Sequence, residues 1–174
     1  MTKQALPPKI LPAVHLRVPT HEDAFVWHRL FDDPDVMEFF GTGASAELSV
    51  YEELTARQRR HDAELGFCLW TLLDGDGEPI GFTGAQPWPH DWGPKGEIEI
   101  GWRLARPAWG KGYATAAARA TLDRVRAAGV RDVVAMVDSR NARSAAVTRR
   151  LGMELAETFT TPTKREAHRF RLTL

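Results

Sequence analysis

The chain has 174 residues, 43% of them hydrophobic, which is enough for one substantial core and leaves little room for a second domain. Lysine plus arginine and aspartate plus glutamate each total 23, so no net charge favours a polyanionic partner such as nucleic acid. No apolar run approaches the roughly 20 residues of a membrane helix, and the N-terminal sequence MTKQALPPKI lacks the apolar centre of a signal peptide. We therefore expect a single domain over residues 1–174, cytoplasmic, with neither membrane nor nucleic acid as a partner.

Residues that form disulfides or bind metals are sparse. The single cysteine, Cys68, excludes an internal disulfide, and its apolar neighbours in GFCLWTLL predict a buried small hydrophobe rather than a nucleophile. The six histidines show neither His-x-x-x-His nor mixed Cys/His spacing. The sequence thus predicts no metal site.

The N-terminal third predicts one strand and two helices. The strand is expected over residues 10–18. The segment 20–31 predicts a helix, because Thr20 stands three residues before Asp23 in a capping-box-like start and apolar residues recur on one helical face. Residues 46–65 are rich in helix formers and predict a second helix.

A hairpin and a loop are expected next. Two β-rich runs, residues 66–74 and 79–86, flank the turn-prone GDGE and should pair as a hairpin. Residues 87–96 contain too much proline and glycine for either regular structure, so we expect a loop there.

The run EIEIGWRL, residues 97–104, begins as an alternation of charged and apolar residues. Because side chains on a strand point to alternate faces, Glu97 and Glu99 would share one face, and Ile98 and Ile100 the other. This pattern predicts a half-buried strand.

A helix is expected directly after a Gly-Lys-Gly corner. Residues 112–128 carry small and apolar side chains at helical spacing on one stripe, with charged residues opposite. Gly129 is a suitable C-cap for this helix.

The remaining elements complete an alternating pattern. We expect a buried strand over residues 132–138, a helix over 141–152 and closing strands over 154–160 and 168–174. Strand–helix–strand units favour parallel neighbours, whereas the earlier hairpin adds antiparallel ones. The sequence therefore predicts an α/β chain with a mixed sheet and helices on both faces.

The glycine corner can bind an anion. Gly110 and Gly112 leave backbone N–H groups unobstructed at the start of a helix, where the helix dipole adds positive potential and Lys111 could add charge. Such a corner is also common as a simple turn. A dinucleotide fits poorly, because Thr115 stands where the Gly-x-Gly-x-x-Gly pattern needs a third glycine or alanine, and Asp132 begins its strand instead of ending it.

The stretches EIEIGWRLARPAWGKGYATAAARA (97–120) and NARSAAVTRRLGM (141–153) resemble two motifs of the GNAT superfamily of N-acetyltransferases, in particular the RimJ/RimL-like branch of ribosomal-protein N-acetyltransferases. The resemblance implies a single GNAT-like domain whose central sheet is mixed, mostly antiparallel and about seven strands wide. Two positions depart from the pattern. Pro107 stands where the first motif often has glutamine or arginine, and Ala116 stands where this branch commonly has glutamate.

The resemblance also implies acetyl-CoA as the cosubstrate. Its pantetheine would run beside the strand, and its pyrophosphate would meet the N–H groups of the glycine corner. Asn141 would contact the pantetheine, although an N-cap role is an alternative that can coexist, and Ser144 would lie near the sulfur or simply be a solvated helix start. The residues implied to bind acetyl-CoA are Trp102, Arg103, Leu104, Trp109, Gly110, Lys111, Gly112, Tyr113, Ala114, Thr115, Asn141 and Ser144.

An amine must be neutral before it can attack the thioester. An α-amino group, with a pKa of about 7.7–8.0, is roughly a tenth neutral at pH 7, whereas a lysine at about 10.4 is almost wholly charged. Glu99 or Glu97 could take the proton directly or through a water, and both could instead form the solvated face of the strand. A backbone N–H near Leu104 could stabilise the oxyanion, and by resemblance Ser144 is the general acid for the departing thiolate.

The sequence therefore predicts transfer of the acetyl group of acetyl-CoA to a primary amine, by direct attack through a tetrahedral intermediate. The acceptor would be a protein N-terminus or a small molecule. The alternative is a non-catalytic acyl-CoA-binding or sensing module, which the departure at Ala116 keeps open. The loop 87–96, with Trp88 and Trp92 as walls, could line the acceptor pocket, or it could be a packed surface loop or a contact of a possible homodimer.

Overall fold

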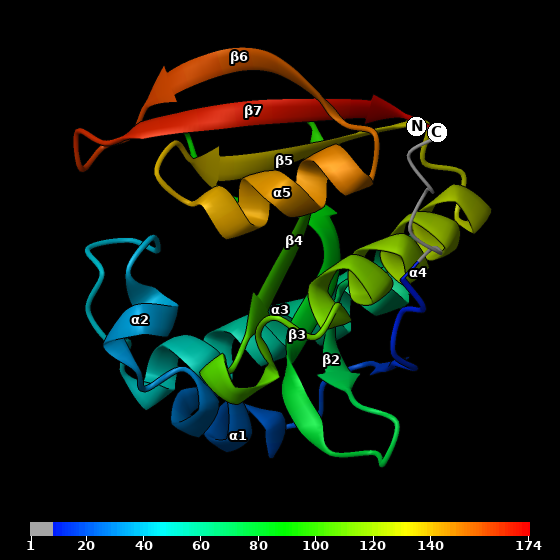
Figure 1. Ribbon diagram of the computed structural model, residues 1–174. Coiled ribbons are helices and arrows are strands. Elements are labelled where there is room, and N and C mark those ends of the chain that lie inside the picture. Colours follow the sequence, from blue (N-terminus) through cyan, green and yellow to red (C-terminus); the bar gives the residue numbers. More distant parts are fainter. Residues whose placement is uncertain (1–8) are drawn as a thin grey trace, which may run out of the picture.

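The computed structural model describes residues 9–174; residues 1–8, most of the stretch in which the sequence predicts no signal peptide, lie outside the described residues. Within residues 9–174, one seven-stranded sheet has the order β1-β2-β3-β4-β5-β7-β6 (Figure 1). Every neighbouring pair of strands is antiparallel except β4 and β5, which are parallel. The mixed, mostly antiparallel sheet predicted from the resemblance is confirmed.

Most elements fall where the sequence predicts them. The strands are β1 (His15–Arg17), β2 (Leu69–Leu73), β3 (Pro79–Pro87), β4 (Ile98–Leu104), β5 (Asp132–Asp138), β6 (Glu154–Thr160) and β7 (Glu166–Thr173). The helices are α1 (Asp23–Leu30), α2 (Pro34–Met37), α3 (Leu48–Leu65), α4 (Tyr113–Ala127) and α5 (Ala142–Arg150), with a turn of 3-10 helix at Arg106–Ala108.

The contact between β4 and β5 is short. In the described part of the chain these two strands register at a single position, Glu99 opposite Val134, and Figure 1 shows β4 diverging from β5. Strands β3 and β4, by contrast, pair along the whole of β4. The backbone of residues 100–104 therefore has no ladder partner on its β5 side in the described structure.

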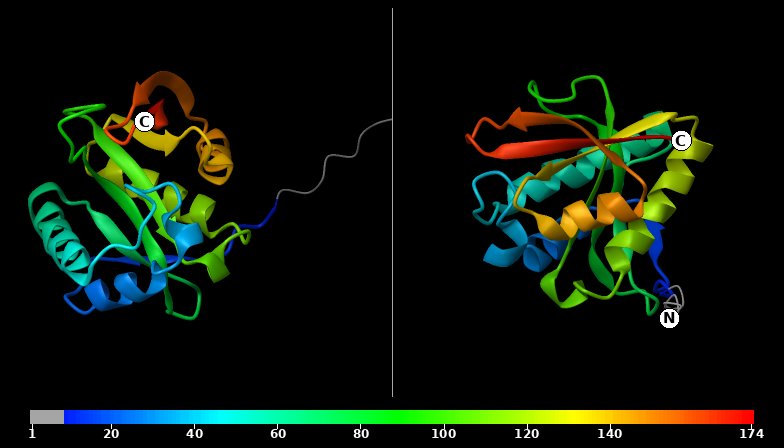
Figure 2. Two further views of the ribbon diagram at one scale, coloured as in Figure 1. Left: turned by 90° about the vertical axis from the view of Figure 1, so that its left-hand side faces the viewer. Right: turned by 45° about the horizontal axis from the view of Figure 1, so that its top comes forward.

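Helices cover both faces of the sheet, as predicted (Figure 2). On one face, Trp27 and Phe31 of the α1 segment pack with Phe82 of β3 in an apolar cluster that α3 completes. On the other face, Leu122 and Val125 of α4 pack against apolar side chains of the central strands. The first face also carries the side chains of Glu99, Gln86 and Arg103.

Cys68 lies in the core between these layers and is fully buried. Burial raises the pKa of its thiol to about 12, so the group stays protonated near neutral pH. The prediction of a small buried hydrophobe is confirmed.

The structure corrects the sequence prediction in two places near the N-terminus. The strand expected over residues 10–18 is confined to β1, and Pro12, which has no N–H to donate to a sheet, lies in the part that is not strand. The single turn α2 was not predicted, because its four residues are too few to show an apolar period. Asp33 caps this turn by accepting a hydrogen bond from the N–H of Asp35 at 2.9 Å.

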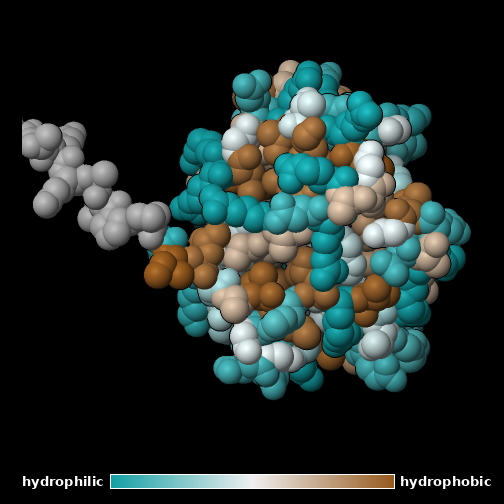
Figure 3. All heavy atoms as spheres, turned by 90° about the vertical axis from the view of Figure 1, so that its right-hand side faces the viewer, coloured by the Kyte–Doolittle hydropathy of each residue, from teal (hydrophilic) through white to brown (hydrophobic). Residues whose placement is uncertain are grey.

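The surface shows alternating polar and apolar character. On the face in Figure 3, brown apolar groups are interrupted by teal polar ones. Large exposed apolar side chains are spread over several elements: Ile10, Phe25, Val50, Leu65 and Leu155. Among the helices of residues 9–174, none combines the length and apolar character that crossing a membrane requires.

Candidate active site

A cavity of about 550 Å³ opens where β4 diverges from β5. Its walls come mainly from the segment around α2, the second half of β4, the first half of α4 and one side of α5. Most of the residues that the resemblance assigned to acetyl-CoA line it: Trp102, Arg103, Leu104, Trp109, Gly110, Gly112, Tyr113, Ala114, Thr115, Asn141 and Ser144. The fold therefore brings together the two sequence motifs of residues 97–120 and 141–153, and the ligand contacts of these residues stay a prediction.

The glycine corner forms one end of this cavity. Gly110 and Gly112 have φ values of 73° and 88°, in the left-handed region that favours glycine. A Cβ on Gly112 would lie 3.2 Å from Pro12 Cδ and 3.3 Å from Leu11 Cδ2, so the corner also packs tightly against the N-terminal segment. Glycine is thus required at residue 112 for conformation and for space.

The start of α4 offers free hydrogen-bond donors. Gly112 is the N-cap, and no side chain within residues 9–174 caps the helix. The first α-helical backbone bond runs from the N–H of Ala116 to the carbonyl of Gly112, at 3.0 Å. The N–H groups of the turn before Ala116 therefore lack helical partners, and this donor set fits a pyrophosphate.

Arginine side chains supply positive charge along the same cavity. Arg119 of α4 and Arg143 and Arg150 of α5 line it, and the Arg143 guanidinium lies 3.8 Å from the centre of the Trp109 ring. Lys111, which the sequence suggested as the added charge, is exposed and lies outside the cavity lining. Sequence reasoning missed these arginines, although Arg143 and Arg150 are seven residues apart and so share a helix face.

Ser144 and Asn141 are held by specific hydrogen bonds. Asn141 is the N-cap of α5, because its Oδ1 accepts the Ser144 N–H at 3.2 Å, so the predicted cap is confirmed. The indole N–H of Trp102 donates to Ser144 Oγ at 3.3 Å. An indole can only donate, so the hydroxyl hydrogen of Ser144 remains available to a group in the cavity.

Glu99 sits at the end of a chain of side-chain amides. The Gln86 amide donates to Glu99 Oε1 at 2.8 Å, and the Gln58 amide donates to Gln86 Oε1 at 2.8 Å. Gln58 Oε1 in turn accepts the Leu69 backbone N–H at 2.9 Å, which fixes the orientation of both amides. Because Oε1 accepts a hydrogen bond, Glu99 Oε2 is the oxygen left to take a proton.

The environment tunes the acidity of Glu99. Burial raises its pKa to about 7, while the Gln86 hydrogen bond and the charge of Arg57 oppose that rise. A carboxyl with such a pKa can accept a proton near neutral pH. It lies outside the lining of the cavity, on the face of β4 that α3 covers.

Glu97 has a different setting. Both of its oxygens accept hydrogen bonds from Arg169 of β7 at 3.1 Å, and its side chain is 41% exposed. Arg169 also pairs with Glu157 at 3.5 Å. Glu97 thus belongs to a partly solvated ion-pair network of the sheet, and of the two candidate bases Glu99 has the environment that suits proton transfer.

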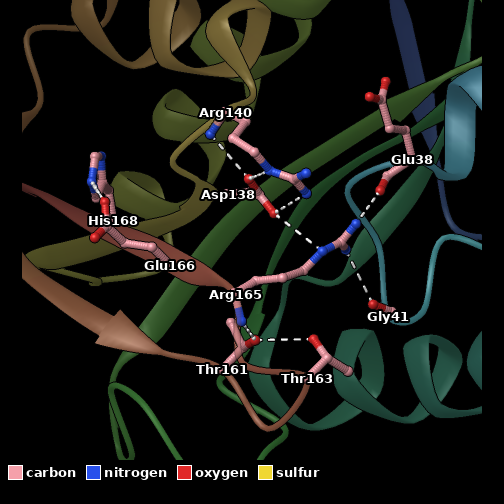
Figure 4. Close-up of polar contacts among 9 residues, drawn as sticks. All are labelled: Glu38, Gly41, Asp138, Arg140, Thr161, Thr163, Arg165, Glu166 and His168. Atoms are coloured by element: carbon pink, nitrogen blue, oxygen red, sulfur yellow. Dashed lines mark hydrogen bonds and ion pairs between the residues drawn. The ribbon is translucent and has the colours of Figure 1, made fainter.

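The segment around α2 closes the cavity on the side opposite α5. Phe39 and Phe40 line it, and neither was proposed from the sequence. Figure 4 shows how this segment is tied: Arg165, in the turn between β6 and β7, donates to the carbonyls of Glu38 at 2.6 Å and Gly41 at 3.2 Å. Arg165 also lies 3.8 Å from Asp138 at the end of β5. The connection from α2 to α3 is therefore attached to the other half of the sheet.

The loop at residues 87–96 packs on itself. Trp88 contacts His90 and Trp92 with ring centroids 4.8 and 5.2 Å apart, and the Trp88 indole donates to the Trp92 carbonyl. None of these side chains belongs to the lining of the cavity. Within residues 9–174 there is also no group of three or more His, Cys, Asp or Glu side chains arranged to hold a metal ion.

Comparison with known sequences identifies relatives. The chain matches the family described as "Acetyltransferase (GNAT) domain" over residues 13–154. The uncharacterized protein YkkB of Bacillus subtilis (strain 168) is 33% identical over 141 residues, which are 79% of this chain and 78% of YkkB. The L-methionine sulfoximine/L-methionine sulfone acetyltransferase of Pseudomonas aeruginosa is 28% identical over 131 residues, 72% of this chain and 76% of that enzyme.

Solved structures share the fold. A putative GnaT-family acetyltransferase from Bordetella pertussis matches with a TM-score of 0.77 at 20% identity, covering 90% of this chain and 93% of that one. RimJ of Mycobacterium smegmatis, in complex with CoA-disulfide, matches with a TM-score of 0.74 at 23% identity, covering 92% of this chain and 81% of that one. At 20–23% identity these structures show a shared fold only. Membership of the family follows from the sequence match over residues 13–154. The chain belongs to the GNAT family of acetyl-CoA-dependent N-acetyltransferases.

Proposed function

We propose that this protein transfers the acetyl group of acetyl-CoA to the primary amine of a protein N-terminus or of a small molecule. The observation that carries the proposal is the arrangement around β4. An uncapped helix start and four arginines line one cavity, with the Ser144 hydroxyl in it, and Glu99 lies on the face of β4 that α3 covers. Bound acetyl-CoA would supply a thioester whose carbonyl the amine can attack.

The hydrogen-bond donors and positive charges of the cavity indicate which residues would hold acetyl-CoA. The N–H groups at the start of α4 would hold the pyrophosphate, with Arg143 and Arg150 balancing its charge. The backbone of residues 102–104, which has no partner on its β5 side in the described structure, can pair with the amides of the pantetheine. This pairing would aim the thioester carbonyl along the strand.

Glu99 is the proposed general base. Its pKa of about 7 lies close to the operating pH, where proton transfer to a carboxylate is most effective. The proton of the incoming ammonium would move to Glu99 Oε2, directly or through one water, because Oε1 is occupied by Gln86. Ser144 would donate its hydroxyl hydrogen bond to the departing sulfur, since the Trp102 indole already holds its oxygen as acceptor.

The RimJ/RimL-like assignment and the acceptor are part of the same proposal. The motifs of residues 97–120 and 141–153 support this branch, and RimJ is among the structural neighbours. The relative that acetylates L-methionine sulfoximine and L-methionine sulfone shows that a small-molecule acceptor occurs at 28% identity. Ala116, which motivated the non-catalytic alternative, lies outside the cavity lining.

Two measurements on the purified chain test the proposal. Calorimetry with acetyl-CoA measures binding, and release of free thiol measures turnover across a panel of small amines and peptides with free N-termini. Binding with turnover on at least one amine supports the proposed reaction. No binding overturns it, and tight binding without turnover on any amine favours the binding or sensing module instead.

A further inference from the structure

Arg103 is a half-buried cation in an aromatic setting. Its guanidinium lies 4.0 Å from the centre of the Phe40 ring, and Phe31 and Phe82 flank it at 5.3 and 5.2 Å. No carboxylate of residues 9–174 pairs with it, and its Nε is buried without a hydrogen-bond partner in that range. The polar group beside it is the hydroxyl of Tyr51.

This setting does not balance the charge. Burial lowers the pKa of the Arg103 guanidinium, with only the Tyr51 hydroxyl acting against it. Arginine nevertheless stays protonated in proteins, and contact with aromatic rings offsets only part of the cost of removing a cation from water. A desolvated guanidinium is normally paired with an anion, and because Arg103 lines the cavity, an anionic group of a ligand can reach it.

The position of Arg103 indicates which ligand. Arg103 lines the cavity but shares a face of β4 with Glu99, whereas Trp102 projects to the opposite face and contacts Ser144. The arginines assigned to the pyrophosphate, such as Arg143, lie on α5. Arg103 is therefore on the side of the strand that holds the proposed base.

The space between Glu99 and Arg103 suits a small acceptor. Gly101 lies between them on the same face, and a Cβ placed on it would meet no atom of the described residues within 4 Å. Residues 99 and 103 are about 13 Å apart along the strand. An acceptor whose amine reaches Glu99 through a water can extend its anionic group along this face toward Arg103.

The charges of this face disfavour a polycationic acceptor. Arg57 of α3 also faces Glu99, and its Nε is likewise buried without a partner among residues 9–174. This face thus carries two guanidinium groups, that of Arg57 near Glu99 and that of Arg103 farther along the strand. A polyamine or an aminoglycoside would bring further positive charge next to them.

We propose that Arg103 binds the anionic group of the acceptor, and that the acceptor is a small amine that carries a carboxylate, such as a free amino acid. This inference rests on the proposed acetyl transfer and adds the chemical class of the acceptor. It assigns the Arg103 side chain to substrate recognition, a role distinct from the backbone contact with pantetheine that the motif resemblance implies.

Matched acceptors test the inference on the wild-type protein. Each series contains an amino acid, its carboxamide and the corresponding amine without the carboxyl group: leucine, leucinamide and 3-methylbutylamine, or phenylalanine, phenylalaninamide and phenethylamine. A peptide with a free N-terminus is added to each series. We expect kcat/KM to be roughly tenfold to a hundredfold higher for the amino acid, because a charge-assisted pair with arginine is lost in the other members.

Variants at residue 103 test the assignment. Arg103→Met keeps an unbranched chain that packs well against aromatic rings and should erase the preference through a higher KM for the amino acid with little change in kcat. Arg103→Lys should retain part of it. Arg124→Met is the matched control, because Arg124 also lies over an aromatic ring, Trp70 at 4.8 Å, but is outside the cavity lining. Thermal denaturation and acetyl-CoA calorimetry show whether each variant is folded.

The outcomes separate the two proposals. Equal kcat/KM for the amino acid, its carboxamide and the amine without the carboxyl group overturns the carboxylate inference and leaves acetyl transfer intact. A preference that persists in Arg103→Met overturns the role of Arg103, and if that variant does not fold, Arg103→Lys and the wild-type series still decide. Binding of acetyl-CoA with no turnover on any acceptor overturns the proposed function and this inference with it.

Discussion

The two faces of β4 carry sites that are built in different ways. On the Trp102 face, the proposed acetyl-CoA site consists largely of backbone groups, glycines and the starts of α4 and α5. On the Glu99 face, the proposed acceptor site consists of side chains from β3, β4, α3 and the α2 segment. A site made of backbone leaves a local sequence motif, whereas a site made of distant side chains does not.

The first prediction tests the Glu99 face alone. Glu99→Gln should lower kcat/KM by roughly a hundredfold to ten-thousandfold by removing the general base, while acetyl-CoA affinity measured by calorimetry should stay within about threefold. Glu97→Gln serves as the comparison and should lose far less, because Glu97 is paired with Arg169. Equal losses in the two variants would contradict the assignment of the base to Glu99.

Stability gives an independent readout of the same variant. Burial raises the pKa of Glu99 to about 7, so the folded state binds the proton more tightly than the unfolded state does. The resulting penalty on folding is absent at low pH, grows as pH rises from the unfolded pKa toward about 7, and is complete above it. Glu99→Gln should therefore raise Tm near pH 8 and have little effect near pH 4.

The second prediction tests the opposite face. Gly112→Ala should weaken acetyl-CoA binding by roughly tenfold or more, because alanine is strained at positive φ and its Cβ would press on Pro12 and Leu11. Gly129→Ala is the matched control, since Gly129 has the same φ of 88°, lies outside the cavity lining and has open space for a Cβ among the described residues. The control should lose comparable stability and no affinity. Similar affinities in the two variants would argue against the glycine corner as the pyrophosphate site.

The third prediction concerns the amide chain behind Glu99. Gln86→Met removes a hydrogen bond that lowers the pKa of Glu99, so that pKa should rise and the acidic limb of the pH profile of kcat/KM should move up by roughly one unit. Arg57→Met should also raise the pKa of Glu99, because it removes a positive charge that lowers that pKa. Gln58→Met should give a smaller shift, because Gln58 acts on Glu99 only through Gln86. An unmoved limb in Gln86→Met would mean that Glu99 is not the titrating group.

The smallest effect is expected at the tie between the α2 segment and the rest of the sheet. Arg165→Met removes the hydrogen bonds to Glu38 and Gly41 and should cost about 1 kcal/mol of stability. It should also raise the KM of the acceptor by about twofold to fivefold, because Phe40 is positioned by this segment. The control is Arg126→Met, which breaks a surface pair with Asp123 and should change neither quantity. A loss of acetyl-CoA affinity in Arg165→Met would mean that the α2 segment serves the acetyl-CoA site, whose cavity it also lines, and not the acceptor alone.

The sequence predicted the Trp102 face well and the Glu99 face poorly, for a physical reason. Periodicity and caps act within one element, so the strand, the corner and the α4 and α5 helices were predictable from residues 97–153. The amides behind Glu99, by contrast, are brought together by packing between α3 and β3, and Gln58 and Gln86 are 28 positions apart in the chain. One of the aromatic rings around Arg103 is Phe40. It follows α2, whose single turn leaves no periodic signal in the sequence.

The limited pairing of β4 with β5 has a consequence for the whole molecule. The strands from β1 to β4 and those from β5 to β7 form two half-sheets that share one ladder position in the described structure, so the protein alone leaves their seam partly open. A ligand that hydrogen-bonds along that seam acts as an additional strand between the two halves. Because it binds the folded chain and not the unfolded one, it adds to the stability of the entire fold. The cosubstrate would thus be a structural component of this enzyme as well as a reactant.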